Sequence, residues 1–267
     1  MKRNKLFFLL TILTCMVGVF IMTSLASCGG GDDPISEYQQ GGNTNGNNNQ
    51  DNNSNDKGTD VSGYSYGRKY VDLGLSVKWA TCNIGANEPY ETGGYYAWGE
   101  ISTKTQYDVD HSKWLSWTTT SPYIEIGKYC TDSNYGIVDG KKTLENSDDA
   151  AFVYWRGNWR MATRDELQEL VDNCTLEWCE SGNKEYNGVA GMKFVSKINS
   201  NYIFLPASGL RNSKLEEFGT DGYYWTSSLG YDGALCAYNL WIFNKVACVN
   251  EGTPVRWEGL QVRAVCP

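Results

Sequence analysis

The residues that most often carry acid–base or nucleophilic chemistry are few in this sequence of 267 residues. Its only histidine is His111, which lies in the polar stretch YDVDHSKW close to Asp108 and Asp110. A Ser-His-Asp or Cys-His mechanism would have to use this one residue as its base. No nucleophile-elbow motif accompanies it, so we interpret His111 as a solvated loop residue.

Two pairs of carboxylates are the next candidates for catalysis. Asp148–Asp149 and Asp165–Glu166 each fall at the start of a predicted helix. There a carboxylate complements the positive end of the helix dipole, whereas a glycosidase needs two separated acids that flank a cleft. Helix capping therefore explains both pairs. The sequence also lacks the glycine-rich motifs that bind dinucleotides or phosphates, and it predicts no enzyme activity and no cofactor.

Nine cysteines are present, and seven of them lie in the part of the chain that is predicted to fold. These seven are Cys82, Cys130, Cys174, Cys179, Cys236, Cys248 and Cys266. Exported chains can keep disulfides, but an odd number leaves at least one thiol free or paired between molecules, and the connectivity cannot be read from sequence. Cys236 and Cys248, on neighbouring predicted strands, either form a disulfide or stay as buried thiols. No CxxC spacing occurs, so no metal site built from cysteines is predicted.

Cys28 is the cysteine whose position predicts a specific modification. A basic start, MKRNKL, is followed by an apolar run that ends near Leu25, which is the layout of a secretory signal. The run is just long enough for a short membrane span, but small residues precede Cys28 and no positively charged flank follows. The tetrapeptide LASC resembles a bacterial lipobox. This resemblance implies that a signal peptide, residues 1–27, is removed and that Cys28 carries acyl chains such as palmitate.

Residues 28–62 are rich in Asn and Gly and contain almost no aliphatic side chains. Such a segment cannot bury enough apolar surface to offset its ordering entropy, so we expect a disordered tether. Its first residues, CGGGDD, resemble the acidic tract that follows the lipid-bearing cysteine in surface-exported lipoproteins of Bacteroidota-type bacteria. This resemblance implies an outer-membrane lipoprotein that faces the cell exterior.

The charge of the chain excludes two classes of partner. Residues 1–27 hold three basic and no acidic residues, so the remainder carries 20 basic against 31 acidic residues, a net charge of −11. Nucleic-acid recognition depends on phosphate neutralisation by Lys and Arg, and this chain has no basic stripe. The same charge opposes docking of the protein surface on anionic lipid, which leaves the lipid on Cys28 as the predicted membrane contact.

A folded domain is predicted over residues 63–267, where all ten tryptophans lie. The clearest helix is 163–174, because Thr163 and Glu166 have the spacing of a capping box and four apolar residues follow on one face. A second short helix, 148–155, is predicted with Ser147 as its cap. The stretch YVDLGLSVKWAT indicates a hairpin. Further strands are expected at 201–207, 222–228, 234–243, 245–249 and 260–266, which together predict an α+β domain on antiparallel sheet.

The order of several motifs resembles one known family. They are YVDLGLSVKWATCNIGA, GGYYAWGE, KYCTDSNYG, DDAAFVYWRGNWRMATRDELQEL, IFLPASG, GYYWTSS and GLQVRAV. Over about residues 66–267 they resemble the FISUMP (Fibrobacter succinogenes major paralogous) domain. They are more distantly similar to the C-type-lectin-like and formylglycine-generating-enzyme superfamily, although Ala162 replaces its usual proline. The resemblance implies a C-type-lectin-like fold, with two helices packed on short, twisted antiparallel sheets.

The motifs by which C-type lectins hold sugar through calcium are absent, since the sequence has neither Glu-Pro-Asn nor Trp-Asn-Asp. Sugars also stack on exposed aromatic rings. Trp114, Trp117 and Tyr123 lie in a polar, Ser/Thr-rich stretch without core periodicity, so we expect them to form an exposed ligand-binding patch. Six tryptophans within the family motifs are interpreted as structural: Trp79, Trp98, Trp155, Trp159, Trp225 and Trp241.

These expectations define one hypothesis and two alternatives. The hypothesis is a surface-displayed lipoprotein whose domain binds a glycan or a surface protein without catalysis. The first alternative is a structural or assembly component of the cell envelope. The second is an enzyme related to the formylglycine-generating branch, which would need a reactive cysteine, such as Cys236 or Cys248, or a metal in a pocket.

Overall fold

The computed structural model describes residues 61–231, 235–250 and 254–267. These residues belong to one compact unit, Asn55–Pro267. The predicted signal peptide, Cys28 and all but the last two residues of the predicted tether lie outside the described residues. No helix in the described ranges is both long and apolar enough to cross a membrane.

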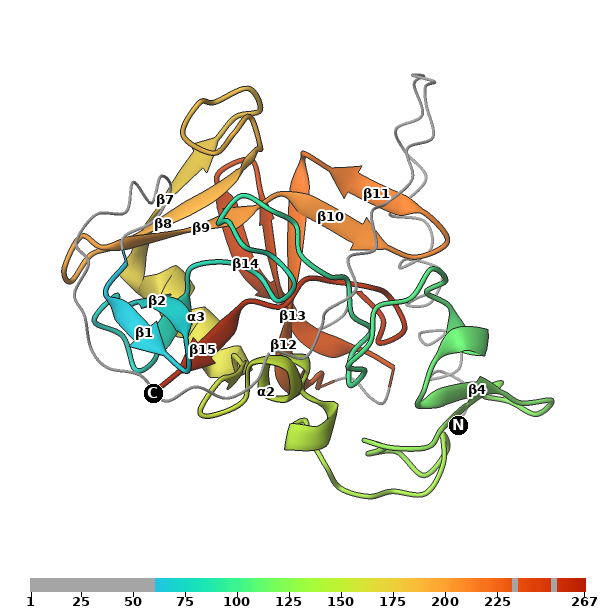
Figure 1. Ribbon diagram of the computed structural model, residues 1–267. Helices are drawn as coiled ribbons and strands as arrows, with labels where there is room; N and C mark the ends of the chain where they lie inside the picture. The colour runs from blue at the N-terminus through green and yellow to red at the C-terminus, as the bar shows by residue number, and fades with distance from the viewer. Residues whose placement is uncertain (1–60, 232–234, 251–253) are drawn as a thin grey trace. The chain divides into compact units, whose positions relative to one another are not determined.

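The first sheet joins the beginning of the folded domain to its end (Figure 1). Its strand order is β1 (Gly63–Ser65), β2 (Arg68–Val71), β3 (Lys78–Ala80), β15 (Ala264–Cys266) and β6 (Arg160–Met161). The hairpin expected from YVDLGLSVKWAT is confirmed, because Val71 in β2 pairs with Trp79 in β3. The C-terminal strand is shorter than predicted. Leu260 and Gln261 form only isolated bridges, to Tyr96 and Tyr224.

A second five-stranded sheet lies beside the first. It runs in the order β11 (Leu215–Phe218), β10 (Ser208–Arg211), β12 (Asp221–Leu229), β13 (Ala237–Phe243) and β14 (Val246–Asn250). Neighbouring strands are antiparallel except for β10 and β12, which pair in parallel at Gly209 and Gly222. The strands predicted at 222–228, 234–243 and 245–249 correspond to β12, β13 and β14, with ends that differ by up to three residues.

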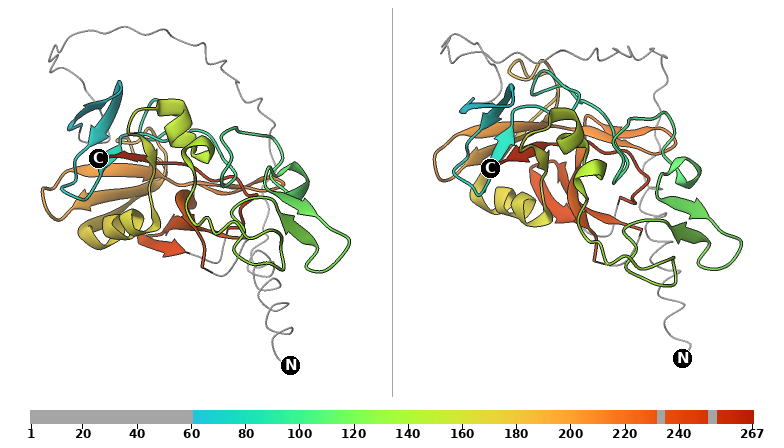
Figure 2. Two further views of the ribbon diagram at one scale, coloured as in Figure 1. Left: turned by 90° about the horizontal axis from the view of Figure 1, so that it is seen from below. Right: turned by 60° about the horizontal axis from the view of Figure 1, so that its bottom comes forward.

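Two smaller antiparallel sheets complete the domain. One consists of β7 (Cys174–Cys179), β8 (Gly191–Ser196) and β9 (Tyr202–Pro206), and the last of these is the strand predicted at 201–207. The other is a two-stranded hairpin of β4 (Leu115–Trp117) and β5 (Ile124–Ile126). Figure 2 shows this green hairpin projecting at the side of the domain away from β1 and β2.

Helix α3 (Arg164–Asn173) forms as predicted. The Thr163 hydroxyl accepts a hydrogen bond from the Glu166 amide at 3.3 Å, and the Glu166 carboxylate accepts one from the Thr163 amide at 2.8 Å. Both bonds of the capping box are therefore present. The apolar face buries Leu167 and Leu170 against β7, β8 and the second sheet.

Helix α2 (Ala150–Trp155) begins two residues later than predicted. Its cap is Asp149, whose carboxylate accepts from the Phe152 amide at 3.0 Å; Ser147 lies in a preceding 3₁₀ turn, η2 (Asn146–Asp148). Asp149 also accepts from the Met161 amide at 2.8 Å. This second bond links the helix start to β6, a tertiary contact that the local sequence does not reveal.

The six tryptophans that were interpreted as structural lie in the core or pack against it. Trp79, Trp98, Trp159 and Trp225 are fully buried, Trp155 is buried, and Trp241 is partly buried. Buried Arg263 donates to the Asn83 side chain and to backbone carbonyls of Ala80, Thr81 and Phe204. The described domain is thus α+β, with two α-helices on small, mostly antiparallel sheets.

Candidate functional site

The β4–β5 hairpin carries Trp117 at its outer end. Leu115 pairs with Ile126 and Trp117 pairs with Ile124, so these four side chains share one face. Leu115, Ile124 and Ile126 are buried in a small apolar cluster. Trp117 continues that face outward, and 58% of it is exposed. The cluster therefore fixes the strand while leaving the indole ring in solvent.

Tyr123 lies in the loop that joins the two strands and is also 58% exposed. The Tyr123 amide donates to the Thr120 carbonyl at 2.7 Å, and its carbonyl accepts from the Thr118 amide at 2.8 Å. Its φ of 72° is in the left-handed region, which non-glycine residues rarely adopt. The two hydrogen bonds thus define the backbone conformation of Tyr123, whose side chain is exposed.

A depression of about 240 Å³ lies beside this loop. Its polar lining comes from Thr118, Thr120, Ser121, Glu125 and Asn134. Hydroxyl, carboxylate and amide groups of this kind exchange hydrogen bonds with sugar hydroxyls. Together with exposed rings nearby, the lining forms the combination of polar and aromatic surface on which small polar ligands are recognised.

Trp114 differs from the other two predicted residues, because it is only partly exposed. Its indole Nε1 donates to the Gly99 carbonyl at 2.8 Å. The ammonium groups of Lys113 and Lys128 lie 4.3 Å and 5.0 Å from the centre of the ring, within range of cation–π attraction. Gly99 has φ 78°, and an added Cβ there would lie 3.1 Å from Nε1. Trp114 therefore anchors the base of the hairpin.

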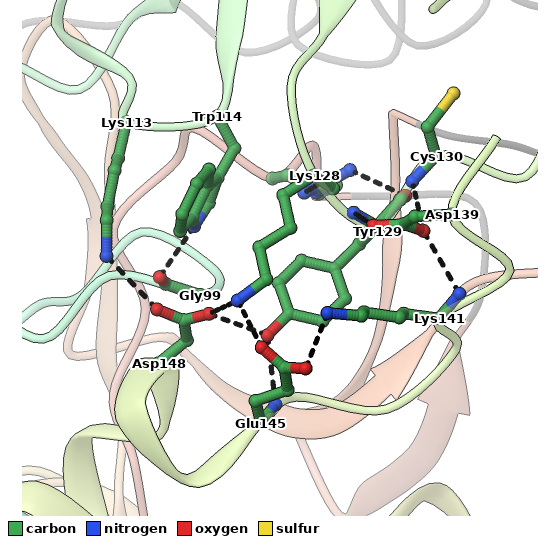
Figure 3. Close-up of polar contacts among 11 residues, drawn as sticks. Gly99, Lys113, Trp114, Lys128, Tyr129, Cys130, Asp139, Lys141, Glu145 and Asp148 are labelled. Atoms are coloured by element: carbon green, nitrogen blue, oxygen red, sulfur yellow. Dashed lines mark hydrogen bonds and ion pairs between the residues drawn. The ribbon is translucent and has the colours of Figure 1, made fainter. Parts of the chain in front are cut away.

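Both lysines that contact Trp114 converge on Asp148 (Figure 3). Lys113 Nζ lies 3.1 Å from one carboxylate oxygen, while Lys128 Nζ and the Tyr129 hydroxyl, at 2.7 Å, donate to the other. Burial by itself would raise the pKa of Asp148, whose side chain is 3% exposed, but these three donors outweigh it and lower that pKa. Asp148 is thus an ionised acceptor in the first turn of η2, whereas the cap of α2 is its neighbour Asp149.

A second layer of contacts surrounds this buried carboxylate. The Tyr129 hydroxyl accepts from the Glu145 amide at 2.9 Å, and the Glu145 carboxylate lies 2.5 Å from both Lys128 and Lys141. Burial raises the pKa of Tyr129 to about 12, so its hydroxyl stays protonated and donates to Asp148. The network ties residues 128–148 to the hairpin base.

His111 lies in a 3₁₀ turn, η1 (Val109–His111), rather than in an irregular loop. Its ring is exposed, and Nδ1 is 2.6 Å from the Asp108 carboxylate. The hydrogen bond with His111 holds the pKa of Asp108 below its usual range. This exposed pair at the surface agrees with a solvated histidine.

The disulfide weighed for Cys236 and Cys248 is excluded. Cys248 in β14 pairs with Trp241 in β13. Cys236 precedes Trp241 by five residues, a separation of about 17 Å at the strand rise. A disulfide needs Cα atoms within about 7 Å. No disulfide joins any of the seven cysteines in the described ranges.

Five of the seven described thiols have a pKa raised by burial, which makes them poor nucleophiles: Cys82, Cys174, Cys179, Cys248 and Cys266. Burial raises the pKa of Cys248, and it raises that of Cys174 to about 11, so the reactive thiolate is scarce at neutral pH. Among the residues that the structure describes, no three His, Cys, Asp or Glu side chains are grouped so that they could hold a metal ion.

A carboxylate cluster that the sequence did not indicate lies between β11 and the C-terminal segment. The Tyr223 hydroxyl donates to Glu217 at 2.5 Å, and Glu258 accepts from the Val255 amide at 2.9 Å. Burial, with Glu216 and Glu217 nearby, raises the pKa of Glu258 to about 7. Because these residues come together only through strand pairing, no local signal could have found them.

The three aromatic residues that were predicted to bind a ligand therefore differ in their exposure and contacts. Trp117 and Tyr123 are exposed on the hairpin, whereas Trp114 supports its base. The pairing of Asp148 with Lys113 and Lys128 was missed because these residues are 15 to 35 positions apart in sequence. Comparison with protein-family models, with curated proteins and with solved structures finds no match to this chain.

Proposed function

We propose that this protein is a surface-displayed lipoprotein whose FISUMP-type, C-type-lectin-like domain binds a glycan without catalysis. The lipid on Cys28 anchors the chain in the outer membrane, and the Asn/Gly-rich tether presents the domain outward. The anchor rests on the likeness of LASC to a lipobox, and the family on the motifs between residues 66 and 267. The binding site is the β4–β5 hairpin.

The observation that carries the binding proposal is the exposure of Trp117 and Tyr123 on an anchored hairpin. A ligand that covers these rings removes apolar surface from water, which favours binding. The cluster beneath β4–β5 and the Trp114 anchor fix the hairpin that carries both rings. Because this hairpin is already ordered, little conformational entropy of the protein is lost when a ligand binds, which favours affinity.

Several features favour binding over catalysis. An enzyme like the formylglycine-generating branch needs a reactive cysteine, but Cys236 and Cys248 lie far apart and burial raises the pKa of the Cys248 thiol. His111 is exposed and pairs with Asp108. A glycan is favoured over a protein ligand because the lining of the depression near the rings includes hydroxyl, amide and carboxylate side chains, which exchange hydrogen bonds with sugar hydroxyls.

The test is a glycan-array screen of the wild-type protein and of Trp117→Ala and Tyr123→Ala variants. Each ring contributes about 1–3 kcal/mol when it is covered, so each variant should weaken a genuine signal about fivefold to a hundredfold. Tyr64→Ala is the matched control, because Tyr64 is equally exposed but lies on β1. An empty array, or equal loss with Tyr64→Ala, would reject the glycan site and favour a protein partner or an envelope structural role.

A further inference from the structure

A second depression, of about 140 Å³, lies between β2, the segment that follows β3, and helix α2. Its lining includes Arg68, Lys69, Thr81, Cys82, Asn87 and Trp155. Figures 1 and 2 show β2 and the β4–β5 hairpin on opposite sides of the domain, so this depression is separate from the proposed glycan site.

Arg68 is the distinctive residue of this depression. Its guanidinium carbon lies 5.2 Å from the centre of the Trp155 ring. Trp155 is buried and is itself fixed by an edge-on contact with Trp159, with ring centres 5.1 Å apart. This cation–π contact with an immobile ring restricts the Arg68 side chain, so less conformational entropy is lost when a ligand binds to it.

The hydrogen-bonding capacity of Arg68 is unused. Within the described ranges, its guanidinium forms no ion pair and no hydrogen bond. Arg263, the other arginine near the floor, is fully occupied: its NH1 group donates to the carbonyls of Ala80 and Thr81 at 3.1 Å and 3.2 Å. The N–H groups of this partly buried arginine can therefore donate hydrogen bonds to an acceptor on a ligand.

The charges around the depression favour an anion of single charge. Lys69 belongs to the lining, and Arg156 follows directly after Trp155. The carboxylate of Glu91, near the lining residue Asn87, already accepts from the Asn87 and Glu88 amides at 2.7 Å and 3.3 Å. The chain as a whole is strongly acidic, which opposes a dianion such as phosphate but leaves room for a monoanion at a basic spot.

We propose that this depression binds the carboxylate group of a small ligand, with Arg68 as its bidentate donor. The planar guanidinium matches a planar carboxylate with two parallel hydrogen bonds. Thr81 and Asn87, two polar residues, also line the depression. Two sources carry this chemistry: an acidic sugar, as in a uronic acid, and a free organic acid.

The test is saturation-transfer-difference NMR on the purified full chain, with glucuronate, acetate and uncharged glucose as probes. Glucuronate should show saturation transfer, glucose should show none at this site, and Arg68→Gln should weaken glucuronate binding about tenfold to a hundredfold, as expected for the loss of charge-assisted hydrogen bonds. Arg164→Gln is the control, because Arg164 pairs with Asp165 at the start of α3.

Two further variants separate the possible outcomes. Arg68→Lys keeps the positive charge but loses the two parallel N–H donors of the guanidinium. This variant should bind glucuronate severalfold more weakly than wild type, and it replaces Arg68→Gln as the test if that variant does not fold. Trp117→Ala should bind glucuronate normally, which separates this site from the hairpin. Tighter binding of glucuronate than of acetate identifies an acidic sugar, and equal binding identifies a free acid. Absence of carboxylate binding, or full binding by folded Arg68 variants, would overturn the proposal.

Discussion

Replacing Asp148 by Asn tests whether the buried network holds the hairpin in place. The substitution keeps the size of the side chain and one oxygen acceptor but removes the negative charge. In the wild type that charge is shared by Lys113, Lys128 and the Tyr129 hydroxyl. The two lysines would then remain close together at the Trp114 ring without the carboxylate that neutralises them.

The exposure of the partners sets the size of the effect. Removal of one partner from a fully buried ion pair costs about 3–5 kcal/mol. Here Lys113 is 44% exposed and Lys128 is 17% exposed, so solvent compensates part of the loss, and we expect the free energy of unfolding to fall by about 2–3 kcal/mol. For a domain of roughly 200 residues this corresponds to a drop in Tm of about 4–12 °C.

The dependence on pH gives a second, independent check. The pKa of Asp148 is lower in the folded state than its ordinary value of 3.8. A lowered carboxylate pKa contributes stability that is present above the unfolded pKa and is lost as the pH falls through the folded one. The difference in Tm between wild type and Asp148→Asn should therefore be constant from pH 7 to pH 5 and should shrink only below about pH 4.

Glu145→Gln is the matched control for this experiment. Glu145 contacts Lys128 as Asp148 does, but it does so at the surface, where ion pairs contribute little. We expect no resolvable change in its Tm by differential scanning calorimetry. Equal effects of the two substitutions, or a Tm of Asp148→Asn that matches wild type at pH 7, would refute the reasoning.

Three other predictions concern separate parts of the chain. Burial raises the pKa of Glu258 to about 7, so ionisation of this carboxylate destabilises the folded state as the pH rises from 4.5 to 7. Glu258→Gln should therefore raise the free energy of unfolding at pH 8 by about 1–3 kcal/mol and leave it unchanged at pH 4. Denaturant midpoints of the variant that equal those of wild type at both pH 4 and pH 8 would count against this. Thr163→Ala removes one bond of the capping box and should lower stability by about 1 kcal/mol, whereas a Thr163→Ser variant that is equally destabilised would argue against the cap. Cys28→Ala should abolish metabolic labelling with palmitate and release the protein from the membrane fraction; a processed, membrane-bound variant would contradict the lipid anchor.

The parts of the fold that were predicted from sequence are those with local signals. Helix α3 carries its own capping box and apolar face within twelve residues, and the β2–β3 hairpin carries alternation around a turn. Each pattern determines the backbone without help from distant residues, and each is found where it was expected. The coarse α+β class follows from the same elements.

The errors came from contacts between residues distant in sequence. Asp148 had the sequence context of a helix cap, but Lys113, from 35 residues upstream, neutralises it instead. The pairing weighed for Cys236 and Cys248 failed because the strand register, which the sequence does not specify, sets them five residues apart. Trp114 and Trp117 lie in the same polar stretch of sequence, so both were predicted to be exposed. The tertiary hydrogen bond from Trp114 to the Gly99 carbonyl shows that Trp114 anchors the hairpin instead.

The most direct test of the account is ¹⁹F NMR of the protein labelled with 5-fluorotryptophan, recorded during titration with a glycan identified on the array. The chain has ten tryptophans, so Trp117→Phe and Trp114→Phe variants assign the two resonances of interest. If Trp117 forms the binding surface and Trp114 anchors it, the Trp117 resonance should shift progressively to saturation while that of Trp114 stays in place. A saturable shift confined to other tryptophans, with the Trp117 resonance unchanged, would contradict the assignment of the hairpin as the ligand site.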